Sequence, residues 1–247
     1  MFSFSAGASA DDFDLKPNIA LLGLQEFRER FYQHEPILWP VCFVSMIRKI
    51  RTEKVAARSA TSSSAPNRLR IIAGRWRGVP ITFPAVESIR PSPDRVRETL
   101  FNWLQHEIVG ASCLDLFAGS GALGIEALSR GAANVTFVDS DPRISRHIEQ
   151  TLQRLSASDQ RVVAMDALKF LKGPAQAFQI VFLDPPYASD LLADVCALLA
   201  KGWLAPRAWI YLENAADRAL PELPAGWTLY RSKRAGQVGY HLVQAIS

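Results

Sequence analysis

Late in the chain, four consecutive residues have the types needed to hold an amino group. They are Asp184-Pro185-Pro186-Tyr187, and they follow an apolar run that reads as a strand. The prolines lack amide donors and stiffen the loop, which leaves the Asp184 carboxylate and the Pro185 carbonyl as neighbouring acceptors. An exocyclic amine held by two acceptors can offer its lone pair, and Tyr187 can stack on the base that carries it. We therefore predict a catalytic site for a nucleobase amine, the alternative being a proline turn that only ends a strand.

A second motif is a glycine-rich turn. Gly119-Ser120-Gly121 and Gly124 form a Gly-x-Gly-x-x-Gly pattern between an expected strand and an expected helix. Glycines there allow a tight turn and let backbone N–H groups approach a nucleotide ligand. The pattern fits both a dinucleotide and S-adenosylmethionine. Asp115 lies just before the turn, where it would repel a pyrophosphate but suits a sulfonium and an ammonium group, which favours S-adenosylmethionine.

Two further acids follow expected strand ends. Asp139 stands twenty residues after Gly119, where a carboxylate can accept ribose hydroxyls, and Asp166 follows the next expected strand. A single acid at such a place can cap a helix, but several at the carboxyl edge of one sheet indicate a ligand site. The predicted cofactor-binding residues are Asp115, Gly119, Gly121, Asp139 and Asp166.

Basic residues are concentrated in one segment. Residues 48–97 contain twelve Lys and Arg against three Asp and Glu, a net charge of +9, whereas the rest of the chain carries −5 within an overall +4. This asymmetry indicates a polyanionic partner, the alternative being a solvated basic tail. The predicted RNA-binding residues are Arg68, Arg70, Arg75, Trp76, Arg77, Arg90, Arg95 and Arg97.

Composition bounds the class of protein. The 247 residues are 49% hydrophobic and 21% charged, which indicates one main globular domain with an appendage. Three widely separated cysteines argue against a disulfide framework, and the four histidines form no cluster that would hold a metal. We recognise no transmembrane or secretory segment. We therefore expect a cytoplasmic monomer without a metal and without a membrane partner.

Alternating strands and helices must position these residues. Short strands are expected at 68–74 and 79–84, followed by a helix that begins at Pro93-Asp94. Further strands are expected at 113–117, 134–139, 161–165, 180–183 and 209–213, and helices at 122–129, 142–155, 167–172 and 191–200. This alternation predicts an α/β fold with a parallel sheet covered on both faces. Segments 227–233 and 238–245 predict a terminal hairpin with one antiparallel strand.

The motifs together resemble one family. Asp184-Pro185-Pro186-Tyr187 after a glycine-rich turn is similar to the amino-methyltransferases that modify adenine N6 or guanine N2 with S-adenosylmethionine. Segments 70–78, 89–104 and 115–121 narrow the resemblance to the RsmD family, the bacterial 16S rRNA (guanine(966)-N2)-methyltransferases. The resemblance covers roughly residues 67–245. Two departures are Ser92, where threonine is expected, and Asp139, where many members carry glutamate.

The resemblance implies a Rossmann-like class I methyltransferase sheet of seven strands, with a small N-terminal hairpin and helix extension. Three zones follow: a flexible extension at 1–66, an RNA-binding hairpin and helix at 67–110, and the methyltransferase domain at 111–247. The first zone has no sustained periodicity and ends in a Ser-rich linker, and Met46 is an alternative start.

The resemblance also implies roles for the candidate residues. Asp115, Gly119 and Gly121 would hold the methionine part of the cofactor. Asp139 would hold its ribose, and Asp166 its adenine. The target guanine would be held by Asp184, Pro185 and Tyr187. The segment Arg68–Arg97 would grip RNA, and Arg95 and Arg97 would also order a lid over the cofactor.

The function implied is S-adenosylmethionine-dependent N2-methylation of a guanine in 16S rRNA within a small-subunit ribosomal particle. One alternative is an adenine-N6 methyltransferase acting on DNA or RNA, which could use the same four residues around Asp184. Others are a non-catalytic RNA-binding protein of ribosome assembly and a dinucleotide-dependent oxidoreductase. In an oxidoreductase the Asp-Pro-Pro-Tyr segment would have no role.

Overall fold

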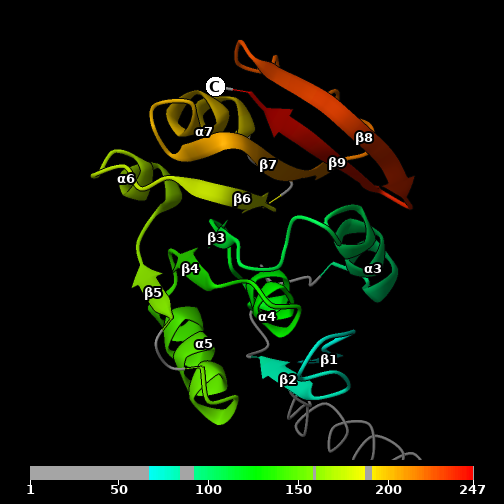
Figure 1. Cartoon of the computed structure of the whole chain (residues 1–247), viewed down its shortest axis with the longest axis vertical. Helices are drawn as coiled ribbons and strands as arrows, with labels where there is room; N and C mark the ends of the chain where they lie inside the picture. The colour runs from blue at the N-terminus through cyan, green and yellow to red at the C-terminus, as the bar shows by residue number, and fades with distance from the viewer. Residues whose placement is uncertain (1–66, 84–91, 158–159, 187–190, 247) are drawn as a thin grey trace, which may run out of the picture. The chain divides into compact units, whose positions relative to one another are not determined.

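The sequence folds into alternating strands and helices from residue 67 onward (Figure 1). The computed structural model describes residues 67–83, 92–157, 160–186 and 191–246, so the extension expected at 1–66 lies outside it. The described residues belong to one compact unit, Ser64–Ser247. The elements are β1 (Asn67–Arg70), β2 (Pro80–Phe83), α3 (Asp94–Trp103), β3 (Ser112–Asp115), α4 (Ala122–Ser129), β4 (Asn134–Asp139), α5 (Pro142–Arg154), β5 (Arg161–Ala164), α6 (Ala167–Leu171), β6 (Phe178–Leu183), α7 (Leu191–Leu199), β7 (Leu204–Ala215), β8 (Trp227–Ala235) and β9 (Val238–Ala245).

In the described part of the chain, seven strands form one sheet in the order β5-β4-β3-β6-β7-β9-β8. Strands β3 to β7 run parallel to one another, and β9 is antiparallel to both of its neighbours. The expected α/β class and the single antiparallel strand of the terminal hairpin are thereby confirmed. Strands β1 and β2 pair with each other in a separate two-stranded sheet.

Both faces of the large sheet are apolar and covered. Side chains alternate along the strands, so Cys113 and Phe137 join the core formed with α3, α4 and α5, whereas Leu114 and Val138 join the core formed with α6 and α7. Burial on both faces explains why these strands read as continuous apolar runs. None of the helices among the described residues is long and apolar enough to cross a membrane.

Several strand boundaries differ from expectation by one to five residues, and the differences in β3 and β7 have clear causes in their hydrogen bonding. Strand β3 ends at Asp115, two residues early, and bonds from the Leu116 and Ala118 amides to neighbouring strands carry the chain into the glycine turn. Strand β7 begins at Leu204, five residues early, because the chain already pairs there with Phe178 across an irregular register. Neither difference moves a candidate site residue away from its strand end.

A buried carboxylate joins the β1–β2 hairpin to α4, the helix that follows the glycine turn. Glu126 of α4 is fully buried and accepts the backbone amides of Ile72 and Ala73 at 2.7 and 3.0 Å. The Arg130 guanidinium donates to the same carboxylate at 2.7 Å. Since buried charges are stable only when they are paired and hydrogen-bonded, this cluster fixes the hairpin against the helix.

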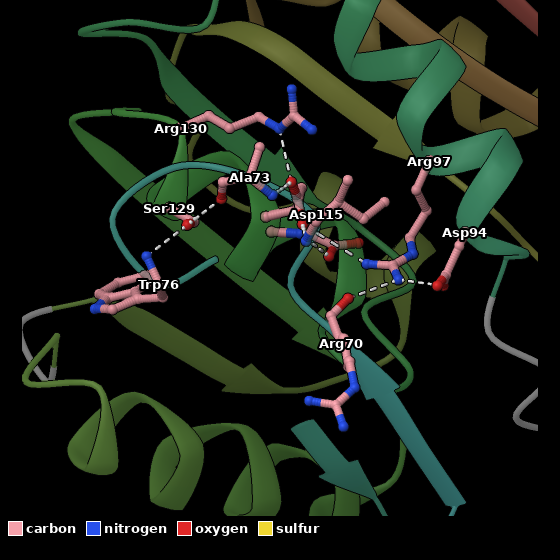
Figure 2. A network of polar contacts seen from close by, with 11 residues as sticks. Arg70, Ala73, Trp76, Asp94, Arg97, Asp115, Ser129 and Arg130 are labelled. Carbon is pink, nitrogen blue, oxygen red and sulfur yellow. Dashed lines mark hydrogen bonds and ion pairs between the residues drawn. The ribbon is translucent and has the colours of Figure 1, made fainter. Parts of the chain in front are cut away.

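Ser129, at the end of α4, makes the second attachment of the hairpin (Figure 2). Its hydroxyl donates to the Ala73 carbonyl at 2.6 Å and accepts from the Trp76 amide at 3.1 Å. Gly74 lies between these two residues at φ +81°, and a Cβ on it would come within 1.8 Å of the Ser129 carbonyl oxygen. Only glycine permits this approach.

Candidate active site

The parallel strands bring three of the predicted acids to one edge of the sheet. Asp115 ends β3, Asp139 ends β4, and Asp184 follows β6 directly. The strand register pairs Asp115 with Phe137 and with Phe182, so the ends of β4 and β6 flank it. Burial is the main cause of a raised pKa at Asp184, and negative charge on Asp115 adds to it. The acids therefore form one electrostatically coupled site at the edge where open α/β folds bind ligands.

The glycine turn between β3 and α4 has the backbone that the sequence motif predicts. Gly119 and Gly121 have φ values of +49° and +74°, and the Gly121 amide closes the turn on the Ala118 carbonyl at 2.7 Å. A Cβ on Gly121 would meet the Ile125 side chain at 3.0 Å, whereas one on Gly119 would meet nothing nearer than 3.9 Å. The turn thus packs on the core at Gly121 and leaves its Gly119 side open to a ligand.

Asp115 is enclosed by the turn. It is only 2% exposed, and its carboxylate accepts the Gly124 amide at 3.0 Å. Burial raises the pKa of Asp115 to about 7; the Gly124 bond opposes this and the charge of Asp139 adds to it. A buried carboxyl with so high a pKa is poised to pair with a cation, because a positive charge beside it would favour the ionised form.

Asp139 anchors the turn as well as facing the sheet edge. Its two oxygens accept the amides of Gly119 at 2.9 Å and of Asp141 at 2.8 Å. Burial is the largest influence on Asp139 and raises its pKa, while these two bonds lower it. Each carboxylate oxygen retains a second lone pair, so Asp139 can still accept a hydroxyl from a ligand.

Asp166 has a different environment from the other acids. It is exposed and caps α6, accepting the Lys169 amide at 3.0 Å. It remains at the same edge of the sheet, because the amide of the preceding Met165 bonds to the Asp139 carbonyl at 2.8 Å. The structure therefore gives Asp166 the capping role that a single acid can have, and its contact with a cofactor stays a prediction.

The Asp184 loop follows β6 and is hydrogen-bonded to Ser92, which is distant in the sequence. Pro185 is buried and Pro186 is exposed, while Tyr187 lies outside the described residues. The Ser92 hydroxyl, just before α3, lies 3.2 Å from Asp184 Oδ2. Burial raises the pKa of Asp184 well above its usual range, and the nearby charge of Glu213 raises it further.

Glu213 is a site residue that the sequence analysis did not select. Ser92 Oγ lies 2.6 Å from Glu213 Oε1, and the Tyr211 hydroxyl donates to the same oxygen at 2.6 Å. Glu213 closes the strand expected at 209–213, so the rule that selected Asp139, an acid at the carboxyl end of a parallel strand, could have selected it too. No sequence signal links Ser92 to either acid.

Most of the predicted RNA-binding residues lie on the surface of the hairpin and of α3. The Arg75 guanidinium stacks over the half-buried Trp76 ring at 4.0 Å, and Arg70 donates to the Gly78 carbonyl at 3.0 Å. Arg90 lies outside the described residues. The exposed cations are Arg68, Arg70, Arg75, Arg77 and Arg95.

Arg97 is a correction, because it has no surface to offer RNA. Its side chain is fully buried and donates to Asp94 at 2.6 Å and to the Arg70 carbonyl at 2.9 Å (Figure 2). Its guanidinium also lies 3.7 Å from Glu126. Arg97 therefore ties α3 to the hairpin and α4, and we remove it from the RNA-binding set.

The sheet order, the glycine turn after its central strand β3 and the acids at the strand ends define a Rossmann-like methyltransferase fold of class I. The family model described as Conserved hypothetical protein 95 matches residues 69–244, and the chain belongs to this family.

Within the described residues, no group of three or more His, Cys, Asp or Glu could hold a metal ion.

Curated relatives and a solved structure agree with this assignment. Ribosomal RNA small subunit methyltransferase D of Escherichia coli is 48% identical over 182 residues, which cover 73% of this chain and 92% of the relative. The Haemophilus influenzae protein of the same name is 44% identical over 186 residues, with coverage of 73% and 96%. The structure of the Escherichia coli protein yhhF is 47% identical, with a TM-score of 0.69 and coverage of 73% and 99%. These matches confirm the resemblance to the RsmD family.

Proposed function

We propose that this protein transfers a methyl group from S-adenosylmethionine to N2 of a guanine in 16S rRNA of the small ribosomal subunit. The observation that carries the proposal is the Asp184-Pro185 loop, placed beside Asp115 at the ligand-binding edge of the sheet. The relatives named rRNA small subunit methyltransferase D support the substrate class. The choice of guanine N2 comes from the family resemblance of the motifs.

The residues at the glycine turn fit S-adenosylmethionine. The open side of Gly119 admits a ligand against the backbone, and the buried Asp115 carboxyl is suited to a cation rather than to a phosphate. Asp139 can accept ribose hydroxyls with its remaining lone pairs, and Asp166 lies at the next strand end. When bound, this cofactor supplies an electrophilic methyl group on a sulfonium.

On the substrate side, the chain's own residues orient the nucleophile. Asp184 and the Pro185 carbonyl accept the two N–H groups of the exocyclic amine, which turns its lone pair away from the ring. The base must leave its stack for its amine to reach Asp184 and the buried Pro185, as base-modifying enzymes require. Most of the rate gain then comes from positioning and from preorganised dipoles.

The exposed cations of residues 67–110 form the proposed RNA-binding surface, and residues 111–247 form the proposed methyl-transfer domain. Arginine side chains on the hairpin can contact phosphates, and the Arg75–Trp76 pair can stack on a base. Because the hairpin is bonded to α4, RNA held on the hairpin would have a fixed position relative to the glycine turn that precedes α4. We propose that the enzyme works as a monomer in the cytoplasm, on rRNA within a small-subunit particle.

One assay tests the reaction and its substrate. Labelled S-adenosylmethionine is offered with small-subunit particles lacking the modification, with naked 16S rRNA and with DNA, and the nucleosides are analysed. We expect label in N2-methylguanine, most strongly from particles. Label in N6-methyladenine would identify the adenine enzyme instead, and absence of label from all three substrates would favour a non-catalytic assembly factor.

A matched pair of variants tests the role of the loop. Asp184→Asn removes the anionic acceptor, so we expect methyl transfer to fall by about 10²-fold or more. Asp194→Asn changes an exposed acid of α7 and should leave the rate unchanged. Cofactor affinity, measured by calorimetry, should be nearly unaffected in both. Full activity of Asp184→Asn would refute the proposed chemistry.

A further inference from the structure

Asp184 meets two other polar side chains that come from distant segments of the chain. Ser92 precedes α3, Asp184 follows β6, and Glu213 lies near the end of β7. Ser92 Oγ lies 3.2 Å from Asp184 Oδ2 and 2.6 Å from Glu213 Oε1, so one hydroxyl bridges two carboxyl groups. Ser92 is 7% exposed and Glu213 is fully buried. The proposed function assigns no role to Ser92 or to Glu213.

The bridge has too few protons for two carboxylates. A serine hydroxyl has one proton, which it can donate to only one acceptor at a time. The shorter contact places that donation on Glu213, and the Ser92 oxygen then presents a lone pair to Asp184. Two acceptors in contact are unfavourable, so this arrangement fits an Asp184 that carries a proton and donates it to Ser92.

The surroundings also favour one proton on the pair. Tyr211 donates to Glu213 at 2.6 Å, which stabilises the ionised form of Glu213. Asp115 of β3 adds a nearby negative charge that disfavours ionisation of Asp184. On β9, Tyr240 is the cross-strand partner of Glu213. Two buried carboxyl groups that share a site cannot both ionise easily, because like charges in a poorly solvated site repel strongly.

We propose that Asp184, Ser92 and Glu213 share one proton, and that an amino group bound at Asp184 displaces this proton through Ser92 onto Glu213. Ser92 passes its own proton to Glu213 and takes the proton of Asp184. Asp184 is then ionised, accepts hydrogen bonds from the amine and from Ser92, and is ready for a further proton. Asp184 touches the substrate, whereas Ser92 and Glu213 are positioning residues.

The step balances with the proposed reaction, on which this inference rests for the identity of the amine. As the amine nitrogen takes the methyl group, a new N–C bond replaces the S–C bond and the positive charge moves to the nitrogen. The nitrogen then loses one proton to Asp184, which restores a neutral amine. Asp184 could not accept this proton if it already carried one, so the transfer to Glu213 is what frees it. When the product leaves, one of the two protons now on the pair passes to solvent, which restores the resting state with one proton.

The first test measures the protons directly in the protein without ligands. Carbon-13 NMR follows the side-chain carboxyl carbons of Asp184 and Glu213 during a pH titration, with signals assigned through Asp184→Asn and Glu213→Gln. We expect both carbons to respond to the same proton uptake, because the pair titrates as one unit. In Glu213→Gln we expect the Asp184 midpoint to fall by about one pH unit or more, since a neighbouring like charge is lost.

The bridge is tested with variants of Ser92 and a matched control. Ser92→Ala removes a donor to the carboxylates, so the first proton uptake should move to higher pH, and Ser92→Thr should restore it. Ser145→Ala removes a buried hydroxyl of α5 that has no hydrogen-bond partner, and it should leave the titration unchanged. If Glu213→Gln does not fold, the Ser92 pair of variants still decides the question.

The second test follows a single round of methyl transfer to small-subunit particles against pH. We expect the acidic limb of the rate to move in the same direction as the NMR midpoints, and Ser92→Ala to be about tenfold slower near neutral pH. Unchanged midpoints in both Ser92→Ala and Glu213→Gln, with rates lowered equally at every pH, would show a packing role and overturn the inference. If the wild-type protein methylated no RNA, the proposed function would be refuted. The NMR titration would still test whether the carboxyl pair shares a proton.

Discussion

At the scale of single residues, Arg95 and Arg97 show how burial separates two identical side chains on one helix. Arg95 is exposed, whereas Arg97 is fully buried against Asp94 and Glu126. We predict that Arg97→Met lowers the free energy of unfolding by about 3 kcal/mol, because the Arg70 carbonyl loses its donor and the buried Glu126 carboxylate keeps only one of its two cations, Arg130. Arg95→Met should change stability by less than about 0.5 kcal/mol and should instead weaken RNA binding.

Urea unfolding and RNA binding at fixed salt concentration check this pair of variants. If both arginine variants were equally stable, Arg97 would not hold the hairpin. If Arg95→Met bound RNA like the wild type, α3 would not contribute to the RNA surface.

The buried Asp115 carboxyl predicts a pH dependence of stability. Burial raises its pKa to about 7, so between about pH 4 and pH 7 the folded protein holds a proton that the unfolded chain has released. Stability therefore falls as pH rises through this window and levels off above the folded pKa. Asp115→Asn keeps an acceptor for Gly124 but has no proton to lose, so its stability relative to the wild type should grow across the window, by at most about 4 kcal/mol.

Urea unfolding of both proteins at about pH 5, 6, 7 and 8 measures this difference. The other buried acids are common to the two proteins and largely cancel. A difference that stays constant with pH would mean that Asp115 is ionised in the folded protein throughout. The same variant should lose cofactor affinity, which calorimetry can follow.

Residue types could be read from the sequence, but their surroundings could not. Asp115, Asp139 and Asp184 were selectable because each stands at the end of an apolar run, and strand ends meet at one edge. The pairing of Ser92 with Glu213 joins residues 121 positions apart, and no local pattern records such a contact. Arg97 and Arg95 do differ in helical spacing, since Arg97 lies three and four residues before Leu100 and Phe101 on the apolar face of α3, a signal that the sequence analysis did not use.

At the scale of elements, the attachment of the hairpin to α4 depends on Gly74. Gly74 and Gly78 have nearly equal φ values, +81° and +80°, so alanine at either should cost a similar amount of backbone strain, about 1 kcal/mol. A Cβ on Gly74 would also collide with the Ser129 carbonyl, whereas one on Gly78 meets nothing within 4 Å. We predict that Gly74→Ala destabilises the protein by about 3 kcal/mol or more, and Gly78→Ala by only the strain.

Free energies of unfolding of the two glycine variants test this, and RNA affinity should fall with Gly74→Ala because the hairpin loses its fixed place. Equal losses for the two variants would mean that the hairpin tolerates a shifted position on α4.

Element boundaries followed from periodicity where each segment had one clear partner. Strand β4 and helix α4 occupy the expected residues 134–139 and 122–129, because their apolar patterns begin and end sharply. Strand β7 extends beyond its apolar centre, since the chain pairs with β6 again at Leu204, on the far side of a register irregularity. The contact between the hairpin and α4 has no periodic signal, so its place in the fold needed the structure.

At the scale of the whole molecule, the compact unit Ser64–Ser247 contains the full family match. We predict that a chain starting at Ser64 unfolds in one cooperative transition with the same free energy as the full chain, because both hydrophobic clusters of the described residues lie within that unit. Urea unfolding of both chains makes the comparison. A broadened or weaker transition in the shorter chain would show that residues before Ser64 contribute to the core.

Strand β8 is an edge strand of the sheet, so no further strand of the described residues pairs with its outer backbone N–H and C=O groups. Such an edge can recruit a strand from another molecule and start aggregation. Here the register is interrupted between Leu229 and Arg231, and the exposed side chains of Arg231, Lys233 and Arg234 give the edge a positive charge. The positive charge makes two copies of this edge repel each other, and the irregular backbone is a poor template for a further strand, so both features oppose edge-to-edge association.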